Sequence, residues 1–518
     1  MKRTMQTALF VSMGMALLSA VPADTGAVGE LVEETWESAQ VEGAKVGSLH
    51  TTVCRIDSDN GKHLRAAAEL ELTFKRNNAL LRLRRVHGTE ETKDGKVIGV
   101  FMRQGQDGER QLVLAGSLEE GRMHVRIDNG RIDRRLPWSD DVVGLYRLEH
   151  LFQERKPKPD ERWTIKRYDP TYNAVVTIRV AVKEREEISR FAQNEKSKLL
   201  RVELTPEPLE APGIKVQPPP EVWWLDEHFV PVRRQFELEG LGTVVLTRTT
   251  QEAAKAAGTP RQLTDIGLKT LIPLNRALTR PYSTRSAVYR ITLRGDGDPG
   301  SAVARDDHQE ISALHGDTFE LHVHPLTSRK RVRRTADPSL TLPARQSEEC
   351  LKTCYFIDCG DARVKELAKR AAGGEKDAWA KARRIERWVK QNMRVDNAAP
   401  LGPASDAARL LRGDCRHYAL LTAALCRAEG IPARTAIGLL YVEKARRPMM
   451  GFHMWTELWI DGQWLGLDAT LGQGSVSAAH VKINDHSWHD TQSLTPLLPA
   501  SRILGKITIA VLSSESEP

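Results

Sequence analysis

The 518-residue chain has few cysteines, few aromatic residues and little net charge. Six cysteines in a chain of this length are too few for a disulfide scaffold. The formal net charge is only +8 and the basic residues are spread along the chain, which disfavours nucleic acid as a partner. Hydrophobic residues make up 40% and charged residues 28%, as in folded globular proteins. The length predicts roughly two to four domains.

Long hydrophobic runs are missing after the first 25 residues. That opening stretch, MKRTMQTALFVSMGMALLSAVPADT, joins a basic start, an apolar run and small residues. This is the layout of a secretory signal peptide over residues 1–23, with cleavage after Ala20 or Ala23. We therefore expect a secreted or periplasmic protein with no membrane span once the signal is removed. An uncleaved membrane anchor is the alternative.

Residues 30–250 show the two-residue alternation of β-strands, as in AELELTFKRNNALLRLRRV and AVVTIRVAVK. Asn77-Asn78, Asp107-Gly108 and Asn129-Gly130 stand where hairpin turns are expected. We predict a β-rich domain here that contains no nucleophile–base pair. Its role, whether binding or scaffolding, stays open.

A smaller β-rich domain is predicted over residues 263–340. It ends in the basic run Arg329–Arg334, RKRVRR, which we interpret as a solvated linker, with a processing site or a polyanion contact as alternatives. From residue 345 the apolar spacing becomes helical, and strands follow after Pro432. This predicts an α+β domain over residues 345–485 and a C-terminal extension over residues 486–518.

Three cysteines lie close together in ECLKTCYFIDCG: Cys350, Cys354 and Cys359. In an exported protein, a disulfide within this trio is expected, although the spacing does not decide which pair forms. A zinc site needs four ligands and no histidine stands nearby, so we expect no metal there.

The stretch GDCRHYALLTAALCRAEGIPAR predicts a helix that begins at Cys415 and has Asp414 as its N-cap. A cysteine in the first helical turn meets free N–H groups and the positive end of the dipole, which stabilise a thiolate and an oxyanion. Cys426 stands eleven residues later, about 16 Å along the helix, too far to bond to Cys415. We expect Cys426 in the core and His417 on the surface.

A base for this cysteine is predicted in GFHMWTELWIDGQWLGLDAT. A turn at Asp461-Gly462 would pair Ile460 with Gln463. This register makes His453 and Asp468 diagonal neighbours on one face of the hairpin, with Cβ atoms about 7 Å apart, so that the carboxylate can orient the imidazole. The opposite face would belong to the core through Phe452, Met454, Leu458, Ile460, Leu465 and Leu467.

The blocks GDCRHYA with GIPAR, HMWTELWI and WLGLDAT together resemble the transglutaminase-like superfamily. The resemblance covers residues from about 345 to 485 and implies a papain-like fold. It implies that Cys415 is the nucleophile, His453 its base and Asp468 the orienting partner. Met454 and Ala469 stand where the family often has a small residue and a proline, which affects the cleft rather than these three groups.

Further expectations concern the substrate. Trp388 and Trp455 are candidate substrate-binding residues, although Trp388 also fits a core position. We expect an exported enzyme that transfers acyl groups from protein or peptide amides through a thioester, without a cofactor or metal. By analogy, hydrolysis by a peptidase or amidase is favoured over cross-linking by a protein-glutamine transglutaminase. A non-catalytic binding or scaffold protein that retains the fold is the other alternative, and the oligomeric state is open.

Overall fold

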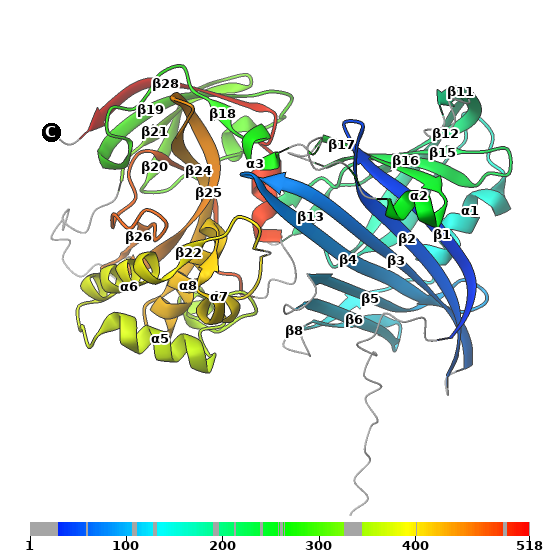
Figure 1. Cartoon of the computed structure of the whole chain (residues 1–518), viewed down its shortest axis with the longest axis horizontal. Coiled ribbons are helices and arrows are strands. Elements are labelled where there is room, and N and C mark those ends of the chain that lie inside the picture. The colour runs from blue at the N-terminus through cyan, green and yellow to red at the C-terminus, as the bar shows by residue number, and fades with distance from the viewer. Residues whose placement is uncertain are drawn as a thin grey trace, which may run out of the picture.

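The computed structural model places the N-terminal and C-terminal halves of the chain in two adjoining lobes (Figure 1). The described residues are 29–58, 61–105, 111–127, 132–189, 196–211, 214–238, 242–256, 258, 263, 265–325, 344–399, 401–489 and 495–516. The predicted signal peptide, the basic run Arg329–Arg334 and the turns at 107–108 and 129–130 lie outside these residues. Among the described residues, no helix is both long and apolar enough to cross a membrane.

The N-terminal lobe is built on one 15-stranded sheet, which confirms the β-rich prediction. Its strands are β1 (Glu30–Val41), β2 (Ala44–Ser58), β3 (Gly61–Arg76), β4 (Ala79–Glu91), β5 (Val97–Gly105), β6 (Leu112–Glu119), β7 (Arg122–Ile127), β8 (Ile132–Pro137), β9 (Val142–Val143), β10 (Arg162–Asp169), β11 (Ala174–Ser189), β12 (Lys196–Pro206), β15 (Glu221–Leu225), β16 (Pro231–Leu238) and β17 (Gly242–Thr249). Their spatial order is β8-β7-β6-β5-β4-β3-β2-β1-β17-β16-β15-β12-β11-β10-β9. Neighbours run antiparallel except β9 and β10.

Local sequence explains these strands. From Leu200 to Pro206, buried residues alternate with partly exposed ones, as the two-residue repeat of a strand requires. The β3–β4 connection is the predicted turn, with Asn77 at φ 50° and Asn78 at φ 67°, a left-handed conformation that asparagine tolerates. Two helices, α1 (Leu145–Arg155) and α2 (Gln251–Lys255), and the short ribbon of β13 (Leu209–Ala211) and β14 (Ile214–Val216) complete this lobe.

The C-terminal lobe is an α+β domain. Its helices are α4 (Ala344–Leu351), α5 (Ala362–Ala372), α6 (Ala378–Asn392), α7 (Ala404–Leu410) and α8 (Cys415–Ala428). Its sheet has the order β18-β25-β24-β27, from β18 (Ile272–Pro273), β25 (Arg447–Ile460), β24 (Ala433–Lys444) and β27 (His480–His486), with β26 (Gln463–Leu467) paired to β25. Short strands β22 (Arg394–Val395) and β23 (Arg412–Gly413) pair beside the start of α8. Asp361 and Asp377 cap α5 and α6, and Gly373 ends α5 at φ 59°, a conformation that glycine adopts without strain.

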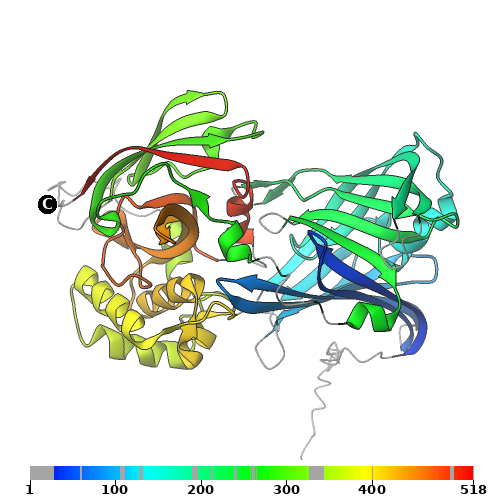
Figure 2. The same ribbon diagram turned by 45° about the horizontal axis from the view of Figure 1, so that its top comes forward.

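A four-stranded sheet lies against this domain. Its strands come from the first part and the last part of the C-terminal half. It consists of β19 (Thr284–Leu293), β20 (Gln309–His315), β21 (Thr318–Val323) and β28 (Ile507–Ser516), in the order β20-β21-β19-β28. The last strand therefore comes from the residues that the sequence set apart as an extension. The helices α3 (Ile266–Lys269) and α9 (Leu498–Ser501) stand near the junction of the lobes (Figures 1 and 2).

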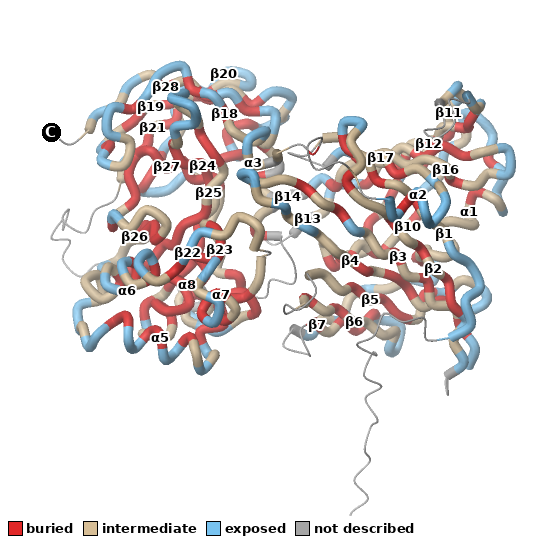
Figure 3. The backbone as a smooth tube through the Cα atoms, in the orientation of Figure 1, coloured by how far each residue is buried: buried red, intermediate tan, exposed pale blue. Residues whose placement is uncertain are grey.

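The two lobes share a hydrophobic core. Buried residues of β5, β6 and β7, such as Val100, Leu114 and Val125, belong to the same contiguous cluster as Ile385 of α6 and Leu420 of α8. Figure 3 shows buried stretches in β5, β6 and α8, whereas the outer turns of α5 and α6 are exposed. Because members of such a cluster are linked by side-chain contacts, the N-terminal sheet shares a core with α8, the helix that carries Cys415.

The expected disulfide is not formed. All six cysteines are free thiols, and Cys350 and Cys359 are buried. The cysteine trio instead lies near Arg427, whose guanidinium donates to the Lys352 carbonyl at 2.8 Å and contacts the Cys354 sulfur at 3.8 Å. The prediction failed because close spacing in a short segment does not fix the directions of the Cβ atoms.

Candidate active site

Cys415 is the first residue of α8, as predicted. Asp414 is the N-cap in extended backbone conformation, and its carboxylate accepts a hydrogen bond from the Arg416 N–H at 3.0 Å. Cys415 is partly exposed, whereas Cys426 is completely buried. Burial raises the pKa of the Cys426 thiol, so this sulfur stays protonated and inert. The structure therefore gives the two cysteines of the helix different environments, as the sequence predicted.

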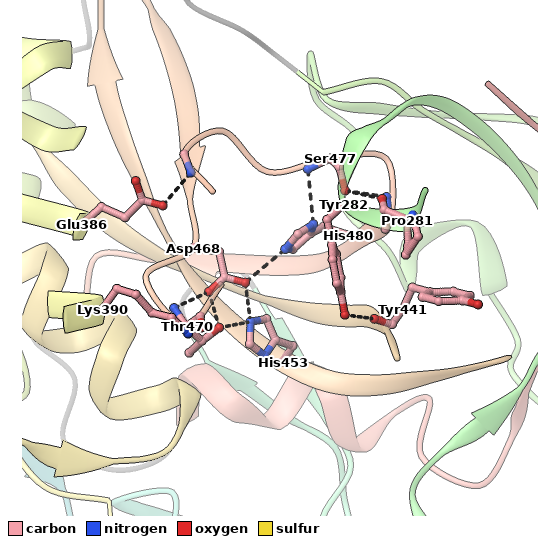
Figure 4. A network of polar contacts seen from close by, with 12 residues as sticks. Pro281, Tyr282, Glu386, Lys390, Tyr441, His453, Asp468, Thr470, Ser477 and His480 are labelled. Carbon is pink, nitrogen blue, oxygen red and sulfur yellow. Dashed lines mark hydrogen bonds and ion pairs between the residues drawn. The ribbon is translucent and has the colours of Figure 1, made fainter. Parts of the chain in front are cut away.

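The hairpin of β25 and β26 has the predicted register, with Ile460 opposite Gln463 and the ladder continuing to Thr456 opposite Leu467. Its turn residue Asp461 has φ 52° and Gly462 has φ 79°. This register brings His453 Nε2 to 2.8 Å from Asp468 Oδ2 (Figure 4). The diagonal relation inferred from the sequence is therefore a direct hydrogen bond.

Asp468 is held by several donors besides His453. Its Oδ1 accepts from the Thr470 N–H at 2.9 Å and from the Thr470 hydroxyl, and its Oδ2 accepts from His480 Nε2 at 3.2 Å. Burial alone would raise the pKa of Asp468, but the His453 charge and these hydrogen bonds outweigh it and lower the pKa far below its ordinary value. Asp468 is therefore ionised at neutral pH.

The electrostatics of His453 follow from this carboxylate. Burial works to lower its pKa, yet the charge of Asp468, followed by that of Cys415, raises the pKa of His453 to about 10. At neutral pH the imidazole is therefore protonated beside the Cys415 sulfur. Such an environment favours a thiolate–imidazolium pair.

His480 is a component that sequence reasoning missed. Its Nδ1 accepts the Ser477 N–H at 3.4 Å, which leaves the proton on Nε2, from where it is donated to Asp468. Burial lowers the pKa of His480, so the ring is neutral. The only sequence signal is a histidine at the start of a β-branched run, and nothing local connects it with a residue twelve positions earlier.

A cleft of about 680 Å³ opens beside Cys415 and His453. Its walls are mainly apolar, and the apolar residues come from the C-terminal half: Leu268, Leu271, Val395, Tyr418, Ile437, Leu440, Val442, Phe452, Met454, Leu497 and Leu504. Arg76 and Asn77 of the N-terminal sheet line it as well. Val395 is 71% exposed, so the rim of the cleft is open to solvent.

Residues 365–469 match the transglutaminase-like superfamily. The C-terminal part of the chain is a transglutaminase-like domain. The match contains Cys415, His453 and Asp468, and it confirms both the resemblance drawn from the sequence motifs and the multi-domain fold class. No curated protein matches the chain.

Three solved structures are similar to parts of the chain at low identity. A candidate cysteine protease from Cytophaga hutchinsonii is 17% identical and covers 45% of this chain and 88% of its own, with a TM-score of 0.29. A beta-barrel-like protein of a domain of unknown function from Brucella abortus is 11% identical and covers 43% and 98%, with a TM-score of 0.32. The periplasmic domain of TgpA from Pseudomonas aeruginosa, bound to ethylmercury, is 16% identical and covers 36% and 91%, with a TM-score of 0.22.

His417 was predicted to lie on the surface, but it is buried. Its Nδ1 lies 3.2 Å from the Asp414 backbone nitrogen and accepts from it, closing a capping box at the start of α8. The third residue of a helix can fold back onto the N-cap, and this is why the expected outward direction was wrong.

The face of β25 that carries His453 is also more enclosed than expected. Trp455 is 1% exposed and packs edge-on against the His480 ring, with centroids 5.3 Å apart. Trp388 is partly buried against the helical core. Neither tryptophan is among the described residues that line the cleft. Contact of either indole with a substrate stays a prediction.

Among the residues that the structure describes, His453, Asp468 and His480 form a group that could hold a metal ion, since their ligand atoms lie within 4.8 Å of one another. In the described hydrogen-bond arrangement both histidine Nε2 atoms carry protons directed at Asp468. A metal would have to displace these two protons and break both hydrogen bonds. The arrangement fits proton chemistry better than metal binding.

Proposed function

We propose that the transglutaminase-like domain is a cysteine enzyme that transfers acyl groups from protein or peptide amides. In this proposal Cys415 is the nucleophile, His453 the general acid and base, and Asp468 the group that orients His453. The observation that carries it is the 2.8 Å hydrogen bond between His453 Nε2 and Asp468 Oδ2 beside a cysteine in the first turn of α8.

The proton positions define the chemistry. Because His453 Nε2 donates to Asp468, Nδ1 is the atom that takes the proton of the Cys415 thiol. The thiolate attacks an amide carbonyl, and the positive end of α8 stabilises the oxyanion. His453 Nδ1–H then protonates the leaving amine, and a thioester remains on Cys415. Attack by water or by a second amine releases the acyl group.

We further propose that water is the preferred acceptor, so that the enzyme is a peptidase or amidase. The open rim at Val395 lets water reach the thioester, and the mainly apolar walls suit the side chains of a peptide. Cross-linking of glutamine to an amine would need a second substrate to enter the same cleft. A non-catalytic scaffold would not require a buried, ionised Asp468 that orients a histidine.

A substrate screen with Cys415→Ala as the blank tests this function. Wild type is expected to release amine from peptide amides, and Cys415→Ala is expected to lose at least about 10³-fold in rate. Cys426→Ala is the matched control and should keep activity, because its sulfur is buried in the core. Incorporation of a labelled amine in preference to hydrolysis would identify a cross-linking enzyme. Activity that survives in Cys415→Ala would reject the nucleophile.

Export also belongs to this proposal, on the evidence of the basic and apolar pattern of residues 1–23. N-terminal sequencing of the protein from cells is expected to find a mature chain that begins after Ala20 or Ala23. An intact Met1 on a membrane-bound protein would indicate the uncleaved anchor instead.

A further inference from the structure

The N-terminal sheet contacts the residue that precedes the candidate nucleophile. Arg76, the last residue of β3, places Nη2 2.6 Å from Asp414 Oδ2 across the junction of the lobes. Its Nε also donates to the Asn397 carbonyl at 2.9 Å, and its side chain is 16% exposed. Arg76 therefore joins Asp414 and the segment after β22 in one partly buried cluster.

The tip of this hairpin is held in place by the chain that connects the lobes. The backbone N–H groups of Asn77 and Asn78 donate to the two carboxylate oxygens of Asp265 at 2.9 and 2.7 Å. Gly267 allows this close approach, since a Cβ at that position would stand 2.6 Å from Asn77 Oδ1. The position of Arg76 is thus fixed from both sides, and the hairpin reaches the C-terminal lobe in both views (Figures 1 and 2).

Among the described residues, three cationic and three anionic groups lie near Cys415 when His453 is protonated, so the loss of one guanidinium would leave an excess of negative charge. Arg416 also binds Asp414, with Nη2 at 2.6 Å from Oδ2, so two guanidinium groups face one carboxylate. Burial and Arg416 lower the pKa of Arg76, whereas Asp414 and Cys415 raise it, and Arg76 and Cys415 line the same cleft. The charged groups near the thiol are Arg76 from β3, Asp414 and Arg416 at the start of α8, Asp396 after β22, His453 from β25 and Asp468 behind it.

We propose that Arg76 is a positioning residue of the candidate active site, by which the N-terminal sheet fixes the start of α8 and supplies the positive charge that favours the Cys415 thiolate. This inference rests on Cys415 being the nucleophile of the proposed function. It gives the N-terminal region a part in catalysis beyond binding or scaffolding, because the thiolate depends on the docked hairpin.

The test is the pH dependence of Cys415 alkylation by iodoacetamide, followed peptide by peptide with mass spectrometry. Arg76→Gln removes the charge but keeps a donor for the Asn397 carbonyl. It is expected to move the midpoint of alkylation up by about one pH unit, so that the rate below the midpoint falls about tenfold. Arg76→Lys keeps the charge and is expected to stay near the wild-type midpoint.

The matched control is Arg65→Gln on the same strand. Arg65 pairs with Glu90 at 3.4 Å and stands eleven residues, about 36 Å of extended strand, from Arg76. Its loss should leave the midpoint unchanged. Equal midpoints for Arg76→Gln, Arg76→Lys and wild type would overturn the inference, because the charge of Arg76 would then have no effect on the reactivity of Cys415.

The alkylation readout needs no substrate, so the two proposals can fail separately. A shifted midpoint without turnover on any amide would keep the role of Arg76 and reject acyl transfer. Turnover that depends on Cys415, with no shift of the alkylation midpoint in Arg76→Gln, would keep acyl transfer and reject the role of Arg76. If Arg76→Gln does not fold, Arg76→Lys in 0.1 and 1 M salt replaces it, since equal midpoints at both salt concentrations would also reject the charge effect.

Discussion

At the scale of single residues, the charge of Asp468 decides the protonation of His453. The pKa of His453 is raised to about 10, above its ordinary value of 6.5. Its contribution to folding stability is therefore fully present below pH 6.5 and is lost as the pH rises through about 10. The same proton is needed for the leaving amine, so activity should fall on the alkaline side near pH 10.

Asp468→Asn is expected to move this alkaline limb down by about one to three pH units, because the charge that raises the His453 pKa is gone. The measurement is kcat/KM against pH, with an NMR titration of the imidazole as a readout that needs no substrate. Asp461→Asn, an exposed carboxylate in the turn of the same hairpin, is the control. A His453 midpoint that stays near the wild-type value in Asp468→Asn would contradict the assigned role.

His480 acts on the same site through Asp468. His480→Phe keeps the packing against Trp455 but removes the hydrogen bond to Asp468, and we expect kcat to fall about tenfold with little change in KM. His480→Gln, whose amide can donate, should recover part of the rate. The alkaline limb should not move down, in contrast to Asp468→Asn. Full activity of His480→Phe would show that His480 contributes to the site only through packing.

At the scale of elements, the β25–β26 hairpin positions the base by its register. Gly462 has φ 79°, where alanine costs about 1 kcal/mol, so Gly462→Ala should lower stability by that amount and slow alkylation and turnover at Cys415. Gly121 has φ 73° in a hairpin of the N-terminal sheet and serves as the control. Gly121→Ala should cost similar stability without slowing Cys415. Equal activity losses would mean that the register is unimportant.

The elements also show which parts of the site could be predicted. The helix that begins at Cys415 and the turn at Asp461-Gly462 are set by residues near them in sequence, so helix pitch and strand pairing gave their geometry correctly. His417 and the cysteine trio were wrongly predicted because their directions depend on neighbours that the pattern does not name. His480 and Arg76 could not be found at all, since each reaches the site through long-range packing.

At the scale of the whole molecule, a buried ion cluster joins the small sheet to the transglutaminase-like domain. Lys482 is completely buried and contacts Asp306 at 2.7 Å, Glu457 at 2.9 Å and Asp485 at 2.8 Å. Lys482→Met would leave these carboxylates with less compensation and should cost about 3–5 kcal/mol in the free energy of unfolding. Lys96→Met, at the exposed pair with Asp140, should cost far less, because water screens that pair. Denaturant titration measures both, and equal losses would show that burial adds nothing.

The sequence by itself determined the local parts of this protein: a thiol at a helix start, a buried second cysteine, and a histidine and an aspartate on one hairpin face. These features follow from the helical repeat of 3.6 residues and the strand repeat of two residues. Such repeats relate only positions that are a few residues apart in the sequence. Only the tertiary structure decided that α8 lies against β25, that His480 donates to Asp468, and that Arg76 approaches Asp414 across 338 positions of the sequence. Burial of apolar surface brings such distant residues together, and no local pattern records which surfaces will meet.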